Sequence, residues 1–163
     1  MFGFEESYGY LTGSYVRDKD GVDGAYMICE MFSYYATKGI SLLDKLDELY
    51  KTYGYCLNTL HSYEFDGSAG FAKMQSIMQA FRGNIKAFGG KKVVKLLDYA
   101  YGLDGLPKSE VLKFLLEDNC SIVVRPSGTE PKLKTYISVS AENKEAAEKV
   151  EAEIRKSAEE NLK

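Results

Sequence analysis

The chain has 163 residues, of which 45% are hydrophobic and 28% are charged, and its 21 Lys and Arg against 24 Asp and Glu give a net charge of −3. This length suits one domain, or a small domain with an appended piece, and excludes a large multidomain enzyme. The composition is that of a globular protein and excludes wholesale disorder. Nucleic-acid binding is not expected, because the chain lacks the basic excess that contacts with a phosphate backbone require.

The sequence gives no sign of a membrane or secretory protein. No apolar run reaches the ~18 residues of a membrane span, and the N-terminus lacks the pattern of a signal peptide. We therefore expect a cytoplasmic protein without membrane contact. Cys29, Cys56 and Cys120 are far apart and outside any C-x-x-C spacing, which argues against a disulfide framework and a zinc site. We expect all three to be reduced core residues.

The first third of the chain is predicted to be mainly helical after an irregular start. Residues 2–20 contain glycines and a charged turn, and no regular element is expected there. Residues 22–38 are apolar nearly all round, which in a helix predicts burial on more than one side. Ser41 and Asp44 have the spacing of a capping box, and the leucines that follow predict a second helix ending at Gly54.

At Tyr55 the hydrophobic period changes from helical to alternating, and we place a domain boundary there, between segments 1–54 and 55–163. Further along, the patterns predict strands at 55–65, 92–99, 111–116, 121–124 and 133–139, and helices at 68–83 and 142–161. Because these helices interrupt the strands instead of alternating with them, we predict an α+β fold. Its antiparallel β-sheet is expected to be covered by helices on one face.

Several conspicuous residues of the second segment have a structural interpretation. The apolar stripe of the helix at 68–83 is predicted to be core: Phe71, Met74, Ile77, Met78 and Phe81. The charges of the last helix, which include the i,i+4 pairs Glu145/Lys149 and Glu151/Arg155, are predicted to form a solvated face. His61 has no companion at the spacing of a metal site or a catalytic triad, and we expect it to be structural.

The residues best suited to chemistry lie in the loop R-P-S-G-T-E-P-K, from Arg125 to Lys132, between two predicted strands. A guanidinium fork, two hydroxyls and the accessible backbone of Gly128 are donors that suit a phosphate dianion. Lys134 on the following strand adds a point charge. From these residues alone two interpretations remain open: a phosphate-binding loop, or a tight turn in which Arg125 pairs with Glu130.

This loop and the strand after it resemble the phosphate-binding loop of the α-D-phosphohexomutases, the phosphoglucomutase and phosphomannomutase family. A second motif, F-E-E-S-Y-G from Phe4 to Gly9, resembles the sugar-binding G-E-x-S loop of that family, with Phe4 where glycine is common. The run R-D-K-D-G from Arg17 resembles the charged turn that follows that loop in phosphoglucomutases. Two motifs in this order are more specific than either alone. The resemblance covers essentially the whole chain and is nearest to bacterial phosphoglucomutase.

The resemblance implies roles for individual residues. Phosphate binding is implied for Arg125, Ser127, Gly128, Thr129 and Lys134, and sugar binding for Glu5, Ser7, Arg17 and Lys19. For Arg17 and Lys19 a solvated, salt-bridged turn is an equally open interpretation. The family's phosphorylated serine, in a T-x-S-H-N-P context, and its D-G-D-x-D-R metal loop do not occur in these 163 residues. We therefore expect neither a catalytic residue nor a metal ligand in this chain.

The implied organisation is a remnant of a third, α/β domain in residues 1–54 and a fourth, phosphate-binding domain in residues 55–163. The implied reaction of the parent enzyme interconverts hexose 1-phosphate and hexose 6-phosphate through a phosphoserine and hexose 1,6-bisphosphate, with Mg²⁺ held by absent domains. We expect this chain alone to be inactive, with hexose phosphate and the missing N-terminal domains as its partners. Two alternatives stay open: a phosphomannomutase or phosphopentomutase of the same family, or a non-catalytic module that self-associates through exposed tyrosine-rich helices.

Overall fold

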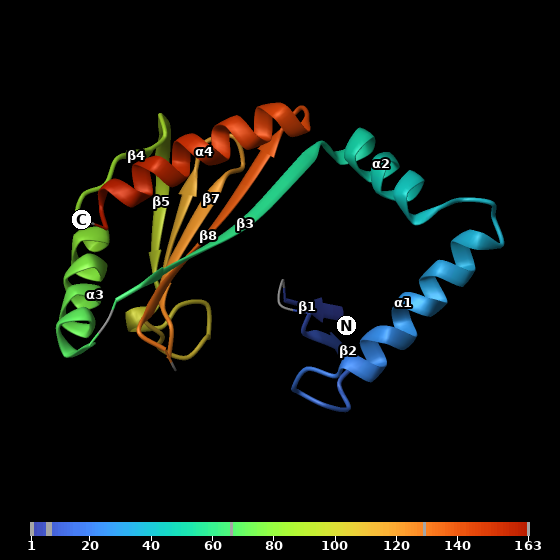
Figure 1. The fold of residues 1–163 in the computed structure, drawn as a ribbon, viewed down its shortest axis with the longest axis horizontal. Coiled ribbons are helices and arrows are strands. Elements are labelled where there is room, and N and C mark those ends of the chain that lie inside the picture. Colours follow the sequence, from blue (N-terminus) through green and yellow to red (C-terminus); the bar gives the residue numbers. More distant parts are fainter. Residues whose placement is uncertain (1, 6–7, 66, 129, 163) are drawn as a thin grey trace. The chain divides into compact units, whose positions relative to one another are not determined.

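The computed structural model describes residues 2–5, 8–65, 67–128 and 130–162. The chain divides into two compact units, Met1–Thr52 and Tyr53–Lys163 (Figure 1). Within the described ranges, no helix has both the length and the apolar character needed to cross a membrane.

The first unit contains a short hairpin followed by two helices. Strand β1 (Phe2–Phe4) pairs antiparallel with β2 (Tyr10–Thr12), and helices α1 (Gly21–Ala36) and α2 (Leu42–Tyr53) follow. The expectation that residues 2–20 hold no regular element was therefore wrong. Each strand is only three residues long, which is too short for an alternating pattern to show in the sequence.

Side-chain caps begin both helices of this unit. Asp20 Oδ1 accepts hydrogen bonds from the backbone N–H groups of Val22 and Asp23, at 2.9 and 3.1 Å. Ser41 Oγ accepts from the N–H of Asp44 at 3.0 Å, and Asp44 Oδ2 accepts from the N–H of Ser41 at 3.2 Å, which confirms the predicted capping box. The caps satisfy donors that the first helical turn leaves without partners.

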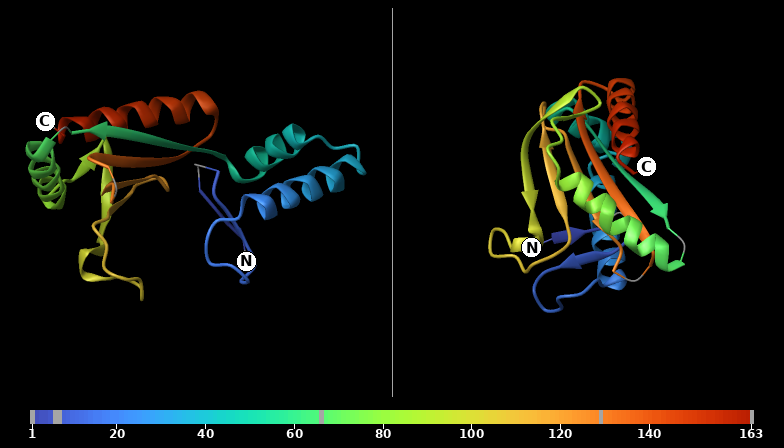
Figure 2. Two further views of the ribbon diagram at one scale, coloured as in Figure 1. Left: turned by 60° about the horizontal axis from the view of Figure 1, so that its bottom comes forward. Right: turned by 90° about the vertical axis from the view of Figure 1, so that its left-hand side faces the viewer.

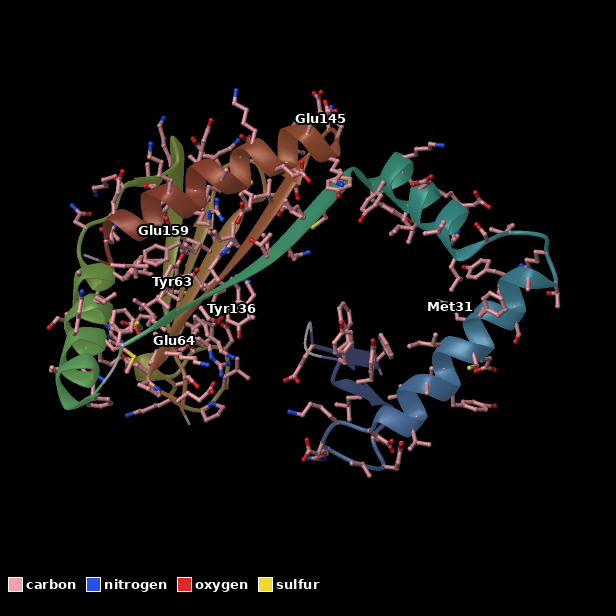
Figure 3. All side chains as sticks on the ribbon, in the orientation of Figure 1. Met31, Tyr63, Glu64, Tyr136, Glu145 and Glu159 are labelled. Atoms are coloured by element: carbon pink, nitrogen blue, oxygen red, sulfur yellow. The ribbon has the colours of Figure 1, made fainter. Side chains whose placement is uncertain are left out.

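The prediction that α1 is buried on more than one side was wrong. Its one buried residue is Gly24, where an added Cβ would lie 2.8 Å from the Tyr10 side chain of β2. Large apolar side chains along the rest of the helix are exposed, including Met31, which Figure 3 labels. They are Val22, Tyr26, Met27, Ile28, Met31, Phe32 and Tyr34. An apolar surface of this kind is typical of an interaction site.

The second unit is a six-stranded antiparallel sheet with the order β3-β8-β7-β6-β5-β4. Its strands are β3 (Tyr55–Glu64), β4 (Ala87–Phe88), β5 (Lys91–Asp98), β6 (Leu112–Leu116), β7 (Ser121–Pro126) and β8 (Lys132–Ala141). Helices α3 (Gly67–Arg82) and α4 (Lys144–Glu160) lie on one face of this sheet (Figure 2), and a 3₁₀ turn, η1 (Tyr99–Tyr101), follows β5. The arrangement confirms the predicted α+β class.

Alternate residues of the strands are buried against the two helices. On β8 the fully buried residues are Leu133, Thr135, Ile137 and Val139, as the alternation predicts. Helix α3 contributes Met74, Ile77, Met78 and Phe81 to the core. Phe71 was wrongly placed in that stripe: it is 62% exposed, and the neighbouring helix position that is buried is Gly70, which packs against Phe65.

The cysteine prediction holds for Cys120, which is buried, and was wrong for the other two. Cys29 is exposed because it lies on α1, whose apolar surface is uncovered within its unit. Cys56 is exposed because it alternates with the half-buried Tyr55 and Leu57 of β3, and so faces away from the helices.

The prediction that the charges of α4 form a solvated face was wrong for Glu151. Glu151 is only 7% exposed and turns toward β3 instead of pairing with Arg155. Its Oε1 accepts a hydrogen bond from Thr59 Oγ1 at 2.8 Å and lies 2.7 Å from His61 Nε2. Nearby, Tyr63 Oη donates to Glu159 Oε1 at 3.2 Å (Figure 3). His61 therefore has the structural role that its isolation in the sequence predicts.

The variant Glu151→Ala leaves Thr59 and His61 without their acceptor between sheet and helix. We expect it to lower the free energy of unfolding by about 1 kcal/mol, the cost of a lost acceptor, since His61 Nε2 and Thr59 Oγ1 lie 3.2 Å apart and can still pair with each other. The matched control is Glu153→Ala on the exposed side of α4, with an expected change within about 0.5 kcal/mol. Urea unfolding followed by circular dichroism measures both, and equal losses would contradict the role given to Glu151.

The turn between β4 and β5 approaches α4 closely at Gly89. This residue has φ +54°, and an added Cβ would lie 2.5 Å from both Glu153 C and Ile154 N of the helix backbone. Its neighbour Gly90 has φ +79° but open space around the same position. The helix backbone cannot move aside as a flexible side chain could, so only Gly89 combines backbone strain with a collision.

We expect Gly89→Ala to cost about 3 kcal/mol of stability and Gly90→Ala about 1 kcal/mol, because both pay for left-handed backbone but only the first displaces α4. Thermal unfolding of the two variants measures the difference. A small loss of equal size in both would contradict the close approach of the turn to α4 at Gly89.

Candidate functional site

The loop that the sequence singles out connects β7 to β8, and the register of these strands fixes what surrounds it. Arg125 lies opposite Lys134, and Val124 lies opposite Thr135. Val124 and Thr135 are fully buried on the face that the helices cover. Because side chains alternate between faces, Arg125 and Lys134 lie side by side on the uncovered face, at the entrance to the loop.

Backbone hydrogen bonds close the base of this loop. The N–H of Ser127 donates to Lys132 O at 2.7 Å, and the N–H of Lys132 donates to Glu130 O at 2.7 Å. Gly128 is exposed, and the position of an added Cβ there is open space. An anion can therefore reach the loop backbone next to Arg125. Thr129, the remaining predicted phosphate ligand of the loop, lies outside the described residues.

Glu130 pairs with Lys132 and not with Arg125. Lys132 Nζ lies 3.1 Å from Glu64 Oε1 and 3.2 Å from Glu130 Oε1, and its hydrogen bonds to these two carboxylates raise the pKa of the amine. Within the described part of the chain, the exposed Arg125 guanidinium forms no ion pair. The interpretation of the loop as a turn held by Arg125 and Glu130 is thus not supported.

A hollow of about 330 Å³ adjoins the loop. It is lined on one side by Arg125, Pro126, Ser127 and Gly128 and on the other by Ser109, Glu110 and Val111. The sequence did not indicate that residues 109–111 belong to the site. The available signal was topological: Leu112 of β6 lies opposite Val124 of β7, so the residues before β6 run beside those that end β7.

Three of the predicted sugar ligands meet in the first unit. Glu5, Arg17 and Lys19 line a hollow of about 300 Å³ that the hairpin and the following turn enclose. Lys19 Nζ lies 3.5 Å from Glu5 Oε2, and both side chains are about half exposed. The salt-bridged turn is therefore present for Lys19, in a place where both groups also face the hollow. Ser7 lies outside the described residues.

The described residues offer no group for the magnesium ion that the resemblance implies for the parent enzyme. Across the residues whose positions are described, no three His, Cys, Asp or Glu side chains lie together in a group that could hold a metal.

Two family models match the chain. One, for the phosphoglucomutase/phosphomannomutase C-terminal domain, matches residues 68–157, and the other, for alpha/beta/alpha domain III of the same family, matches residues 1–53. The chain therefore belongs to the phosphoglucomutase/phosphomannomutase family.

Relatives named phosphoglucomutase agree with this assignment, and one solved structure has a similar fold. A phosphoglucomutase of Staphylococcus aureus strain MSSA476 is 40% identical, and that of strain USA300 is 38% identical, each over 94% of this chain and 30% of the relative. The open form of pp63/parafusin, a phosphoglucomutase from Paramecium, has a similar fold, with a TM-score of 0.65 and 20% identity over 96% of this chain and 29% of that one. The chain spans about 30% of the length of the curated relatives that it matches.

Arg125 and Lys134 are two cations at opposite positions of neighbouring strands, which should lower the stability of the unit. Like charges directly opposite each other on a sheet repel, so Lys134→Met is expected to raise the free energy of unfolding by about 0.5 kcal/mol. The matched control is Lys132→Met, two residues away on the same face, which loses the ion pairs to Glu64 and Glu130 and should lower stability. Chemical denaturation measures both, and a loss in Lys134→Met as large as that in the control would contradict the repulsion.

Proposed function

We propose that this chain is the phosphosugar-binding C-terminal part of a phosphoglucomutase. In this proposal residues 1–54 belong to the third domain of the enzyme and residues 55–163 form its fourth, phosphate-binding domain. The two family matches and the relatives named phosphoglucomutase support the assignment. The observation that carries the binding role is the adjacent pair Arg125 and Lys134 beside the open backbone of Gly128.

The loop holds the phosphate group that is not being transferred. Arg125 offers a planar fork to two phosphate oxygens, and Lys134 adds a second positive charge beside the dianion. Ser127 and Thr129 donate from their hydroxyls, and Gly128 lets its N–H approach closely because no side chain intervenes. The role of these residues is positioning and charge neutralisation, which is most of what phosphoryl transfer needs from a protein.

The sugar hydroxyls are bound by the first unit. The Glu5 carboxylate accepts hydrogen bonds, the Ser7 hydroxyl both donates and accepts, and Arg17 and Lys19 donate. A carboxylate next to an ammonium group serves hydroxyls in either orientation of the ring, which suits a bisphosphate whose two ends exchange places.

The reaction itself interconverts hexose 1-phosphate and hexose 6-phosphate through a phosphoserine and hexose 1,6-bisphosphate, in the cytoplasm. Neither the family's serine motif nor its D-G-D-x-D-R metal loop occurs in the 163 residues, so this chain alone is inactive in our proposal. Mannose and pentose phosphates are alternative substrates within the same family. The exposed apolar side chains of α1 favour docking against N-terminal domains of the same polypeptide, and self-association when those domains are absent.

The test is an amide NMR titration of the 163-residue chain with glucose 1,6-bisphosphate. We expect shifts at residues 125–128 and 134, and an affinity at least about tenfold weaker in Arg125→Met, because a guanidinium–phosphate fork is a strong, charge-assisted contact. Arg155→Met on α4 makes the same change of side chain away from the loop and should bind as the unaltered chain does. Equal affinity in the unaltered chain and Arg125→Met would contradict the proposal.

A further inference from the structure

Arg82, the last residue of α3, bridges the two ends of the connection between β5 and β6. Its Nε donates to Asp98 Oδ2 at 2.9 Å, at the end of β5, and its Nη2 lies 2.6 Å from Glu110 Oε1, two residues before β6. The second contact is an ion pair. Arg82 and Asp98 are less than one-fifth exposed, so solvent screens their charges only in part.

The contacts hold Arg82 and Asp98 in their charged forms. The hydrogen bond to Asp98 raises the pKa of Arg82, and the contact with Glu110 raises it further. Burial raises the pKa of Asp98, but the hydrogen bonds from Arg82 and from the N–H of Ala100 outweigh burial and hold this pKa below its usual value. One guanidinium against two carboxylates leaves the cluster with a net charge of −1.

This cluster adjoins the phosphate hollow through Glu110. Glu110 lines the hollow opposite Arg125 and Ser127, and it is the one acidic residue among the described residues of the lining. A phosphate dianion that enters the hollow therefore approaches a carboxylate as well as a guanidinium. The repulsion depends on how far Arg82 offsets the charge of Glu110, because opposite charges at 2.6 Å largely cancel each other's field at a distance.

We propose that Arg82 is a positioning residue of the phosphate hollow. It offsets the charge of Glu110, and by pairing with that carboxylate it prevents Glu110 from pairing with Arg125. This inference rests on the proposed function, namely that the hollow beside Arg125 binds phosphate. Arg82 touches no ligand in this account and acts through Glu110. A residue of α3 thereby reduces the negative charge in the lining of the phosphate hollow.

The test changes the net charge of the cluster in steps. The net charge is 0 in Glu110→Gln, −1 in the unaltered chain and −2 in Arg82→Met. It is again −1 in the double variant that combines the two substitutions, since each removes one charge from the cluster. We expect Glu110→Gln to bind glucose 1,6-bisphosphate about twofold more tightly, Arg82→Met about fivefold more weakly, and the double variant within about twofold of the unaltered chain. These differences should shrink as sodium chloride is raised to about 1 M.

The same NMR titration, repeated with inorganic phosphate, measures the four affinities, and urea unfolding shows which variants fold. A loss in Arg82→Met with no recovery in the double variant would mean that Arg82 only supports the fold, and would overturn the proposal. Glu110→Gln keeps the Arg82–Asp98 bond and gives an independent test, in which unchanged or weaker binding also overturns it. If Arg125→Met weakens binding while the charge series does not, this inference fails and the proposed function stands. Failure of the unaltered chain to bind would contradict both.

Discussion

The register between β7 and β8 is the constraint on which the candidate site depends. Four fully buried residues of β8, at alternate positions from Leu133 to Val139, fix which face of the strand meets the helices. A slip of β8 by one residue would turn Lys134 toward the core and separate it from Arg125. The same register places two cations opposite each other. Their repulsion opposes stability, and the surrounding core maintains the arrangement where an anion can use the charges.

The two units are stabilised differently, and their candidate binding residues are positioned by different kinds of structure. The second unit has a core of Phe, Ile, Leu and Val side chains between one sheet face and two helices, and its site lies at the end of that rigid sheet. The first unit buries little, is ordered by the caps at Asp20 and Ser41, and presents its polar hollow from a hairpin and a turn. Arg82, at the end of α3, connects this unit's helix to its site, because its ion-pair partner Glu110 lines the hollow.

Much of this arrangement follows from local sequence pattern, and the remainder depends on contacts between distant segments. The alternation of β3 and β8 and the capping box at Ser41 are periodic or short-range signals, and the loop from Arg125 carries its donors in eight consecutive residues. The sequence could not show that α1 is uncovered here, because apolar periodicity indicates a buried face without saying which segment covers it. The burial of Glu151 could not be predicted for a related reason, because its partner His61 is 90 residues away in the sequence. Residues 109–111 join the hollow only through the pairing of β6 with β7.

The most direct test of this account is a crystal structure of the chain grown with glucose 1,6-bisphosphate. We expect a phosphate group within hydrogen-bonding distance of the Arg125 guanidinium and the Gly128 N–H, with Lys134 beside it and Glu110 still paired with Arg82. A bound phosphate elsewhere on the chain, with Arg125 in contact only with solvent, would contradict the claim that the β7–β8 register builds an anion site.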